Sequence, residues 1–403
     1  MTLYEKLILD LFEIRNYKII DSKATKSIQL DLERTSKSVC PICRKECPKY
    51  DSSSQRFYIG NLNGKVVYAD VKIYRIMCEE HGVITEHHGI TKGKRKYTET
   101  VAKNIINYTE VLDNTSVAKL LGLSPSTVYR IDREKLLEMF LKYKTNIPKT
   151  TKICVDETAY RKRHNYVTII CDYNTSKVLW VEKDRTKYSL IQGYKAISST
   201  LSNIECVSMD LWSPYDTITQ KTIPKAKIIY DKFHLTRILN RYIEDQRREY
   251  QKELTKEEIK EMKKNYRWIL LKRKDNHSFT NSLDLEELKK KTQKLYELYL
   301  LKESFLAIFD EPNKTRKEAS RMIFSWIKEV NKTDLTYLKK FAKATLKRLR
   351  KMLNWFDCPI SNGKAEGINN TIKTLFKRAY GYKDFEYMRL KILQKSGTLM
   401  NYV

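Results

Sequence analysis

The stretch from Lys149 to Tyr230 constrains the fold most, because its apolar residues come in short runs typical of strands. Three runs follow one another closely, and an Asp-Tyr-Asn turn joins the second to the third. A helical pattern over 186–202 then leads to two further runs. The five predicted strands are 152–155, 166–171, 178–181, 204–209 and 226–230. This order of elements predicts an α/β domain with a mixed sheet and helices on both faces.

Acidic residues follow two of these strands. Asp156 ends the first strand, and Asp210 ends the fourth. The order of elements is that of a ribonuclease-H-like fold, in which these two strands are neighbours, so the two carboxylates should converge. A third acid, Glu366, opens a helix near the C-terminus. Clustered carboxylates need counter-charge, and Mg²⁺ or Mn²⁺ prefers such oxygen ligands. The alternative for each acid is an ordinary solvated side chain.

The chain as a whole is strongly basic. Lys and Arg number 78 against 49 Asp and Glu, which gives a formal net charge of +29. Such a surplus predicts a polyanionic partner, whose condensed counterions are released on binding. An anionic membrane is the competing interpretation, but no apolar stretch approaches the ~20 residues of a spanning helix. We therefore expect a cytoplasmic protein that acts on DNA or RNA.

Paired metal-ligand residues stand out between positions 40 and 81. Cys40 and Cys43 form one pair, and Cys78 and His81 form a second, each with two intervening residues. Two such pairs are typical of a tetrahedral zinc site, here with three cysteines and one histidine. Cys47 could replace one ligand. An Asn-Gly pair between two β-rich stretches predicts a hairpin in the same region. The competing interpretation is a cluster of free thiols.

The segment 115–131 has the pattern of a helix-turn-helix. Gly122 permits a sharp turn, and Ser124 can cap a second helix that starts with proline. This geometry is that of a DNA recognition helix, although helical hairpins are also common as plain structure. The side chains predicted to point outward from the second helix are Ser126, Thr127 and Arg130.

The remaining C-terminal half has helical spacing. The range 235–355 is rich in Lys, Glu and Leu without sustained heptads, so it predicts a helical insertion. Beyond it, Glu366 shares one helix face with three groups suited to a DNA backbone. These are Asn370, Lys373 and Lys377. The alternative is an amphipathic surface helix with no contact to DNA.

Three further residues near the predicted site have two interpretations each, and a fourth serves as a control. Asp231 and His234, just after the fifth strand, could support metal or DNA, or could fix the fold by a hydrogen bond. Trp212 could stack on an extruded base or be a buried core residue. Strand alternation predicts that Glu157 points away from Asp156 and is dispensable.

The whole chain resembles a bacterial insertion-sequence transposase of the DDE type, specifically the ISL-three (ISL3) family. The motifs that carry the resemblance are the Cys-Pro-x-Cys finger, the helix-turn-helix and the final Ser-Asn-Gly-x-x-Glu-Gly-x-Asn-Asn segment. The Val-Asp-Glu, Met-Asp-Leu-Trp-Ser-Pro-Tyr and Asp-Lys-Phe-His sequences also stand where that family has equivalents. His81 departs from the family pattern, in which the fourth zinc ligand is usually cysteine.

The resemblance implies that Asp156, Asp210 and Glu366 are the catalytic triad of a ribonuclease-H-like core. Two Mg²⁺ or Mn²⁺ ions would then support cleavage at the ends of the element and strand transfer into target DNA. The implied partners are double-stranded DNA, as terminal inverted repeats and target, and further copies of the chain in a homodimer or larger homo-oligomer. Association with the bacterial nucleoid follows from these partners. Two alternatives remain: a catalytically inactive DNA-binding regulator, or a nuclease without strand transfer.

These expectations divide the chain into four parts: a small zinc-binding β domain, a helix-turn-helix domain, a catalytic domain in two segments, and an all-α insertion. The predicted ranges are 1–95 for the zinc-binding domain, 96–148 for the helix-turn-helix, 149–234 and 356–403 for the catalytic domain, and 235–355 for the insertion.

Overall fold

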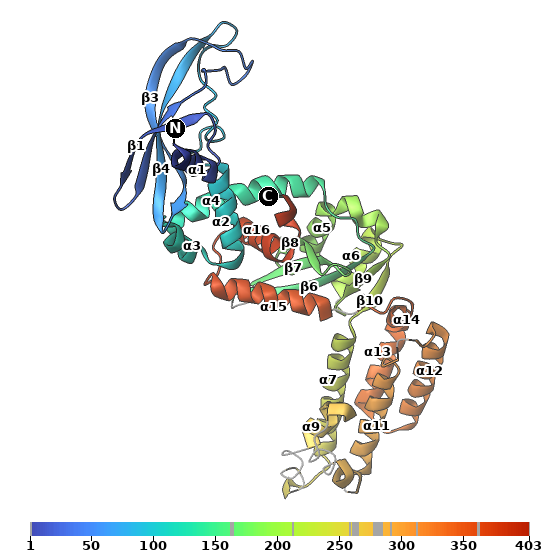
Figure 1. Ribbon diagram of the computed structural model, residues 1–403. Helices are drawn as coiled ribbons and strands as arrows, with labels where there is room; N and C mark the ends of the chain where they lie inside the picture. Colours follow the sequence, from blue (N-terminus) through green and yellow to red (C-terminus); the bar gives the residue numbers. More distant parts are fainter. Residues whose placement is uncertain are drawn as a thin grey trace. The chain divides into compact units, whose positions relative to one another are not determined.

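The structure is a computed structural model, and its described residues form two compact units (Figure 1). The described residues are 2–161, 165–211, 213–257, 259, 266–276, 285–290, 292–311, 313–360 and 363–402. One unit joins Met1–Asn146 with Thr374–Val403, and the other comprises Ile147–Lys373. The residues from Thr374 onward thus pack with the N-terminal part of the chain. The four predicted domain ranges stay predictions.

The first unit begins with helix α1 and a five-stranded sheet of order β1-β2-β4-β3, with β5 paired to β4. The bounds are α1 Leu3–Leu11, β1 Tyr17–Ala24, β2 Ile28–Arg34, β3 Lys49–Leu62, β4 Lys65–Cys78 and β5 Gly82–Thr85. Asn63 and Gly64 form the predicted hairpin turn between β3 and β4. Their φ angles of 50° and 78° give the left-handed backbone that Asn and Gly tolerate best.

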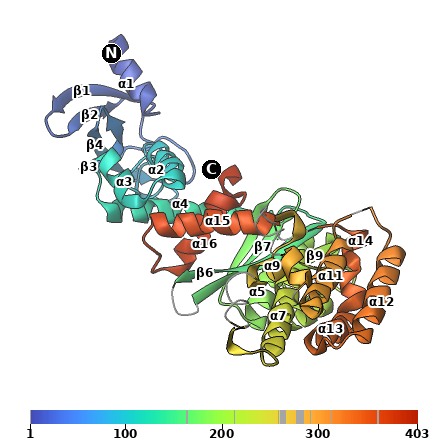
Figure 2. The ribbon, with the colours of Figure 1, turned by 90° about the horizontal axis from the view of Figure 1, so that it is seen from below.

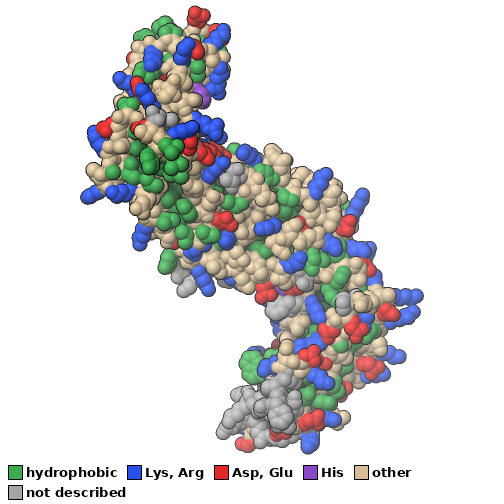
Figure 3. Space-filling view, in the orientation of Figure 1, with side chains coloured by type: hydrophobic (Ala, Val, Ile, Leu, Met, Phe, Trp, Pro, Cys, Tyr) green, Lys and Arg blue, Asp and Glu red, His purple; other side chains and the backbone are tan. Residues whose placement is uncertain are grey.

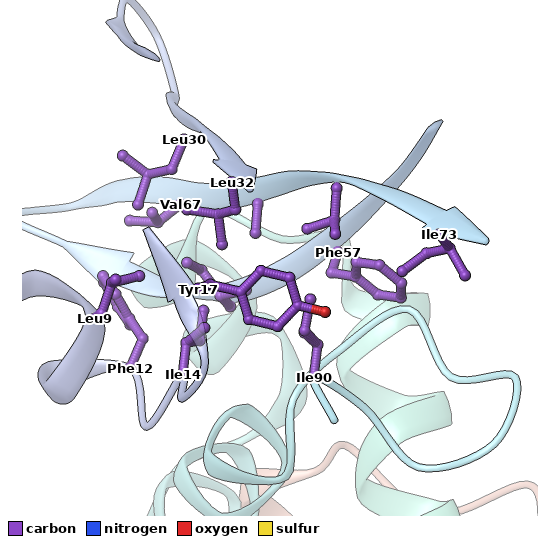
Figure 4. Packing of buried hydrophobic residues seen from close by; sticks show 13 residues of the cluster. Leu9, Phe12, Ile14, Tyr17, Leu30, Leu32, Phe57, Val67, Ile73 and Ile90 are labelled. Atoms are coloured by element: carbon purple, nitrogen blue, oxygen red, sulfur yellow. The ribbon is translucent and has the colours of Figure 1, made fainter. Parts of the chain in front are cut away.

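The core of this sheet forms on one face, because apolar residues alternate along its strands. Val67, Ala69, Val71 and Ile73 of β4 are all buried, and each is separated from the next by one residue. Figure 4 shows how side chains from α1 and the following turn pack against these strands. The labelled residues of this cluster are Leu9, Phe12, Ile14, Tyr17, Leu30, Leu32, Phe57, Val67, Ile73 and Ile90.

Helices complete the first unit: α2 Glu99–Val111, α3 Asn114–Leu121, α4 Pro125–Thr145 and α16 Phe385–Ser396. The predicted helix-turn-helix is formed by α3 and α4. Gly122 ends α3 with a left-handed φ of 66°, and the Ser124 hydroxyl accepts a hydrogen bond from the Thr127 amide at the start of α4. In α16, Lys391 donates to buried Asp132 of α4 at 3.2 Å, so the C-terminal helix is anchored to the second helix of the motif.

The second unit contains a mixed sheet of order β10-β9-β6-β7-β8. The bounds are β6 Lys152–Arg161, β7 Asn165–Asp172, β8 Lys177–Lys183, β9 Cys206–Met209 and β10 Lys227–Tyr230. The pairs β6–β9 and β9–β10 are parallel, whereas β6–β7 and β7–β8 are antiparallel. Helices α5 Lys187–Ala196 and α6 Ser213–Thr222 pack against each other and against the sheet. The predicted sequence of five strands is therefore present.

Strand β6 extends furthest beyond its predicted range, which ended at residue 155. Pairing with β7 carries β6 on to Arg161, whereas its pairing with β9 stops at Val155. Asp156 therefore lies inside β6 but at the end of its parallel ladder with β9. The sequence pattern missed this because residues beyond Val155 are polar or only partly buried.

Within 235–355 the described residues are helical or irregular, and no strand occurs among them. The helices of the second unit after β10 are α7 Lys232–Gln251, α9 Tyr266–Leu271, α11 Gln293–Ala307, α12 Arg316–Lys332, α13 Thr336–Met352, α14 Asn354–Asp357 and α15 Gly363–Arg378, the last of which continues into the first unit. Helices α7, α11, α12 and α13 pack side by side, as Figure 2 also shows. Phe305, Trp326 and Phe341 meet in their shared core. No described helix has the length and apolarity needed to cross a membrane.

Candidate active site and Cys/His site

Asp156 and Asp210 meet at one end of two neighbouring parallel strands. Met209, the last residue of β9, is paired with Val155 of β6, so each aspartate directly follows one member of the final pair. Oxygens of Asp156, Asp210 and Glu157 all lie within 4.8 Å of one another. The strand order thus brings together two acids that are separated by more than fifty residues in the sequence.

The predicted orientation of Glu157 is wrong, whereas its dispensability stays a prediction. Strand alternation should turn its carboxylate away from Asp156, yet Glu157 belongs to the same group of acids, and its side chain is only 6% exposed. Alternation fixes only the direction in which a side chain leaves the strand, and the Glu157 carboxylate still comes within reach of Asp210, which follows the neighbouring strand β9. Its Oε1 is 3.3 Å from Nε of Arg185.

The neighbouring acids are held in an environment that disfavours negative charge. Burial raises the pKa of Asp156 to about 6, and the charge of Asp210 contributes to the same effect. Burial likewise raises the pKa of Glu157 to about 7, although Arg185 opposes the shift. A cation among the three carboxylates would relieve this repulsion. Because all the donors are oxygens, the group fits a hard divalent cation such as Mg²⁺ or Mn²⁺.

His234 and Asp231 lie close to this group at the start of α7. Nε2 of His234 is 2.8 Å from Oδ1 of Asp210, and both side chains are largely buried. Burial alone would lower the pKa of His234, but the hydrogen bond and the charge of Asp210 outweigh it and raise the pKa. Asp231 is buried at the residue before α7. Trp212 lies outside the described residues.

Glu366 is placed differently from the two aspartates. It lies in the first turn of α15, its side chain is exposed, and it is not part of the group of three acids. Its helix nevertheless reaches the site, because Nδ2 of Asn369 donates to Oδ2 of Asp156 at 2.8 Å. With a rise of about 1.5 Å per residue, Glu366 begins roughly 4.5 Å along the helix axis from Asn369.

Asn369 is a site residue that the sequence reasoning missed. A signal for it exists, because residues four before and three after it, Ala365 and Ile372, are buried apolar positions of α15. A polar amide on the apolar face of a helix requires a hydrogen-bond partner, which here is Asp156. The predicted DNA-contacting residues of α15 lie elsewhere on it and are exposed: Asn370, Lys373 and Lys377.

The predicted Cys/His ligands also converge. Sγ of Cys43 is 3.7 Å from Sγ of Cys78, and Nδ1 of His81 is 3.7 Å from Sγ of Cys40 and 3.5 Å from Sγ of Cys78. A tetrahedron with zinc–sulfur bonds of ~2.3 Å has edges of about 3.8 Å, so these separations suit zinc. Cys47 packs against the cluster but is not one of the four converging donors.

The predicted recognition residues lie at the start of α4. Ser126 and Arg130 are exposed, and Thr127 is half-buried. The hydroxyls of Ser126 and Thr127 are each 2.9 Å from the hydroxyl of Ser124, so both are engaged within the capping turn. The guanidinium of Arg130 lies over the ring of Tyr97, 5.8 Å from its centroid. Arg130, the one charged residue of this predicted set, is therefore accessible to a partner.

The comparisons with known proteins identify the class of the chain. Residues 153–392, which include the two paired aspartates and Glu366, match the sequence model of a transposase family. This range is more than half of the 403 residues. The chain belongs to the ISL3 family of insertion-sequence transposases.

Two insertion-sequence transposases are similar to this chain over most of its length. The transposase for insertion sequence element IS1001 from Bordetella parapertussis is 26% identical over 378 residues, which cover 91% of each chain. The transposase for IS1557 from Mycobacterium tuberculosis is 22% identical and covers 85% of this chain and 82% of its own. A solved structure titled Drosophila P element transposase strand transfer complex aligns with 10% identity and a TM-score of 0.40, over 74% of this chain and 92% of that chain.

Proposed function

We propose that this transposase binds the terminal inverted repeats of an insertion sequence and catalyses metal-dependent DNA cleavage and strand transfer. The observation that carries the proposal is the meeting of Asp156 and Asp210 at the ends of two neighbouring parallel strands, in a chain of a transposase family. The strand order β8-β7-β6-β9-β10, with β7 antiparallel to the other four, supports a ribonuclease-H-like assignment for this core.

The catalytic triad in this proposal is Asp156, Asp210 and Glu366. Bound Mg²⁺ or Mn²⁺ would supply an activated water and stabilisation of the leaving 3′-oxygen. The two aspartates hold their carboxylates where the parallel pairing of β6 and β9 ends, and the Asn369 amide fixes the orientation of Asp156. His234 does the same for Asp210 through its 2.8 Å contact. The position of Glu366, one turn before Asn369, supports its role as the third carboxylate.

The Cys/His site is proposed to hold a structural zinc ion. Four converging donors leave no open position for a substrate, which is typical of structural rather than catalytic zinc. His81 takes the fourth position, in line with the distances to Cys40 and Cys78. The ion would tie the turn after β4 to the segment that precedes β3.

Recognition of the element ends is assigned to the first unit, and contact with the DNA backbone to the exposed cations of α15. The helix-turn-helix geometry and the exposed Arg130 support the first assignment. The proposal includes a homodimer or larger assembly on DNA at the nucleoid, in which each copy binds one element end. Lys373 and Lys377 can contact phosphates without reading sequence.

An integration assay tests the proposal. Purified protein, Mg²⁺ and a linear fragment with the matching inverted repeats are incubated with a supercoiled target plasmid, and the products are separated on a gel. Joined products are expected. Nicks without joining would favour the nuclease alternative, and specific binding without any cut would favour the regulator. Asp156→Asn protein is the control that separates this activity from a contaminating nuclease.

A further inference from the structure

A cationic cleft lies beside the carboxylate site in the second unit. It has a volume of about 820 Å³ and is lined by residues of α6, β10, α13 and α14 and by Arg316 at the start of α12. Leu211, the residue directly after Asp210, is part of its wall, whereas the three carboxylates do not line it. Asp216 is the one acid among its lining residues. The basic residues that line it are Lys225, Lys227, Arg316, Lys347, Arg348, Arg350 and Lys351.

Ion pairs neutralise only part of this charge. Nζ of Lys351 lies 2.6 Å from both oxygens of Asp216, and Asp357 accepts from Arg316 at 2.8 Å and from Lys227 at 3.1 Å. The cations that form no ion pair with any described residue are Lys225, Lys347, Arg348 and Arg350. Each of these four is exposed. The cleft therefore carries uncompensated positive charge at its surface.

The cleft differs from the rest of the basic surface in the way its cations are arranged. Lys and Arg side chains are spread over the whole face seen in Figure 3, so the net charge of the chain does not by itself locate a binding surface. Here, however, the cations come from two walls, since Lys225 precedes β10 and the other unpaired cations lie on the last turns of α13. Lys347 and Arg350 are three residues apart and thus neighbours on the helix surface.

We propose that this cleft binds the phosphate backbone of target DNA. Duplex DNA carries one negative charge per ~1.7 Å of its axis, so the last turns of α13 can contact several phosphates at once. Lys and Arg contacts to phosphate fix position without reading bases, which suits a DNA partner bound without sequence preference. The identification of this DNA as the target of transposition rests on the proposed function, whereas the binding of duplex DNA at this cleft does not.

The test is a triple variant, Lys347→Ala/Arg348→Ala/Arg350→Ala, in the full-length protein. Its affinity for a random-sequence duplex should fall at least about tenfold at low salt, and the slope of log K against log salt should become shallower by about 2 to 3. Strand transfer into the plasmid should fall in parallel, while cleavage at the element ends persists. The binding is measured by fluorescence anisotropy over a series of salt concentrations.

A matched control removes three charges from a neighbouring helix of the same bundle: Lys317→Ala/Arg321→Ala/Lys328→Ala. These residues are exposed on α12 and do not line the cleft. The control variant should retain most of the random-sequence affinity. Lys225→Ala provides an independent measurement from the opposite wall without changing α13, and about one unit of slope should be lost.

Equal affinities and equal salt slopes for the triple variant and its control would overturn the inference. An equal response of random-sequence RNA and DNA would also overturn it, because the cleft would then be a general polyanion site. If the wild-type protein makes no joined products but the binding results follow expectation, the proposed function fails and the DNA-binding cleft stands.

Discussion

The two candidate metal sites differ in how far apart their donors lie in the chain. The Cys/His site takes its four donors from two short segments, 40–43 and 78–81. The acidic site takes Asp156 and Asp210 from different strands, and its proposed third member, Glu366, comes from a helix near the C-terminus. Local pairs need only a hairpin to bring them together, whereas the acids need the complete sheet. In the structure all four Cys/His donors converge, whereas Glu366 is not part of the group that Asp156, Glu157 and Asp210 form.

The donor atoms of the two sites agree with the roles proposed for them, which are structural for the Cys/His site and catalytic for the acidic site. Sulfur and nitrogen atoms at 3.5 to 3.7 Å form a complete tetrahedral set, which leaves no room for a substrate. The donors at the acidic site are all carboxylate oxygens, and Leu211, the residue after Asp210, lines a cationic cleft. A closed site stabilises a fold, and an open one with hard oxygen donors can accept phosphate together with its cation.

Removal of the Cys/His ligands is expected to have the largest effect. In Cys40→Ser/Cys78→Ser protein, bound zinc should disappear, and the sheet of the first unit should lose its cooperative melting transition, since metal binding is coupled to folding. Metal content by mass spectrometry and thermal melting measure both. The single variant Cys47→Ser is the control and should keep its zinc. A double variant that melts like wild type would show that the site is dispensable for folding.

Removal of one acid charge should abolish chemistry and leave binding intact. Asp156→Asn and Asp210→Asn keep the shape of the side chain, but a metal contributes several kcal/mol to catalysis, so cleavage and strand transfer should each fall ~10³-fold or more. Glu366→Gln should do the same if it is the third ligand. Binding to the inverted repeats should not weaken. Normal strand transfer by any of the three would remove that residue from the triad.

The sequence pattern predicted those features of the structure that depend on residues close together in the chain. The paired cysteines, the Asn63-Gly64 turn and the Ser124 cap are all found, because each is decided within a few residues. The meeting of Glu157 with Asp210 could not be predicted, because Asp210 follows a different strand, β9, more than fifty residues away. The packing of α16 on α4 through Lys391 and Asp132 was equally hidden, since 259 positions separate the two residues.

The variant Glu157→Gln tests whether this residue's role follows from the strand pattern around it or from its position beside the two aspartates. The strand pattern predicts no effect, whereas its position beside Asp156 and Asp210 predicts a loss of about 10- to 100-fold in strand transfer, the usual cost of disturbing groups around a metal. Glu205→Gln, an exposed acid just before β9, is the matched control. Full activity of the Glu157 variant would mean that this carboxylate only pairs with Arg185.

The smallest effect is expected in the first unit, at Arg130. A base-edge contact is worth about 1–3 kcal/mol, so Arg130→Ala should weaken binding to the inverted repeat by that amount and leave random-sequence binding nearly unchanged. Arg130→Lys keeps the charge but not the planar fork, so it should lose most of the same discrimination. Lys142→Ala, near the far end of α4, is the control for a basic residue lost from the same helix. Competition titrations with both DNAs measure the ratio of affinities. Equal losses on both DNAs would mean that Arg130 contacts only phosphate, and that sequence is read elsewhere.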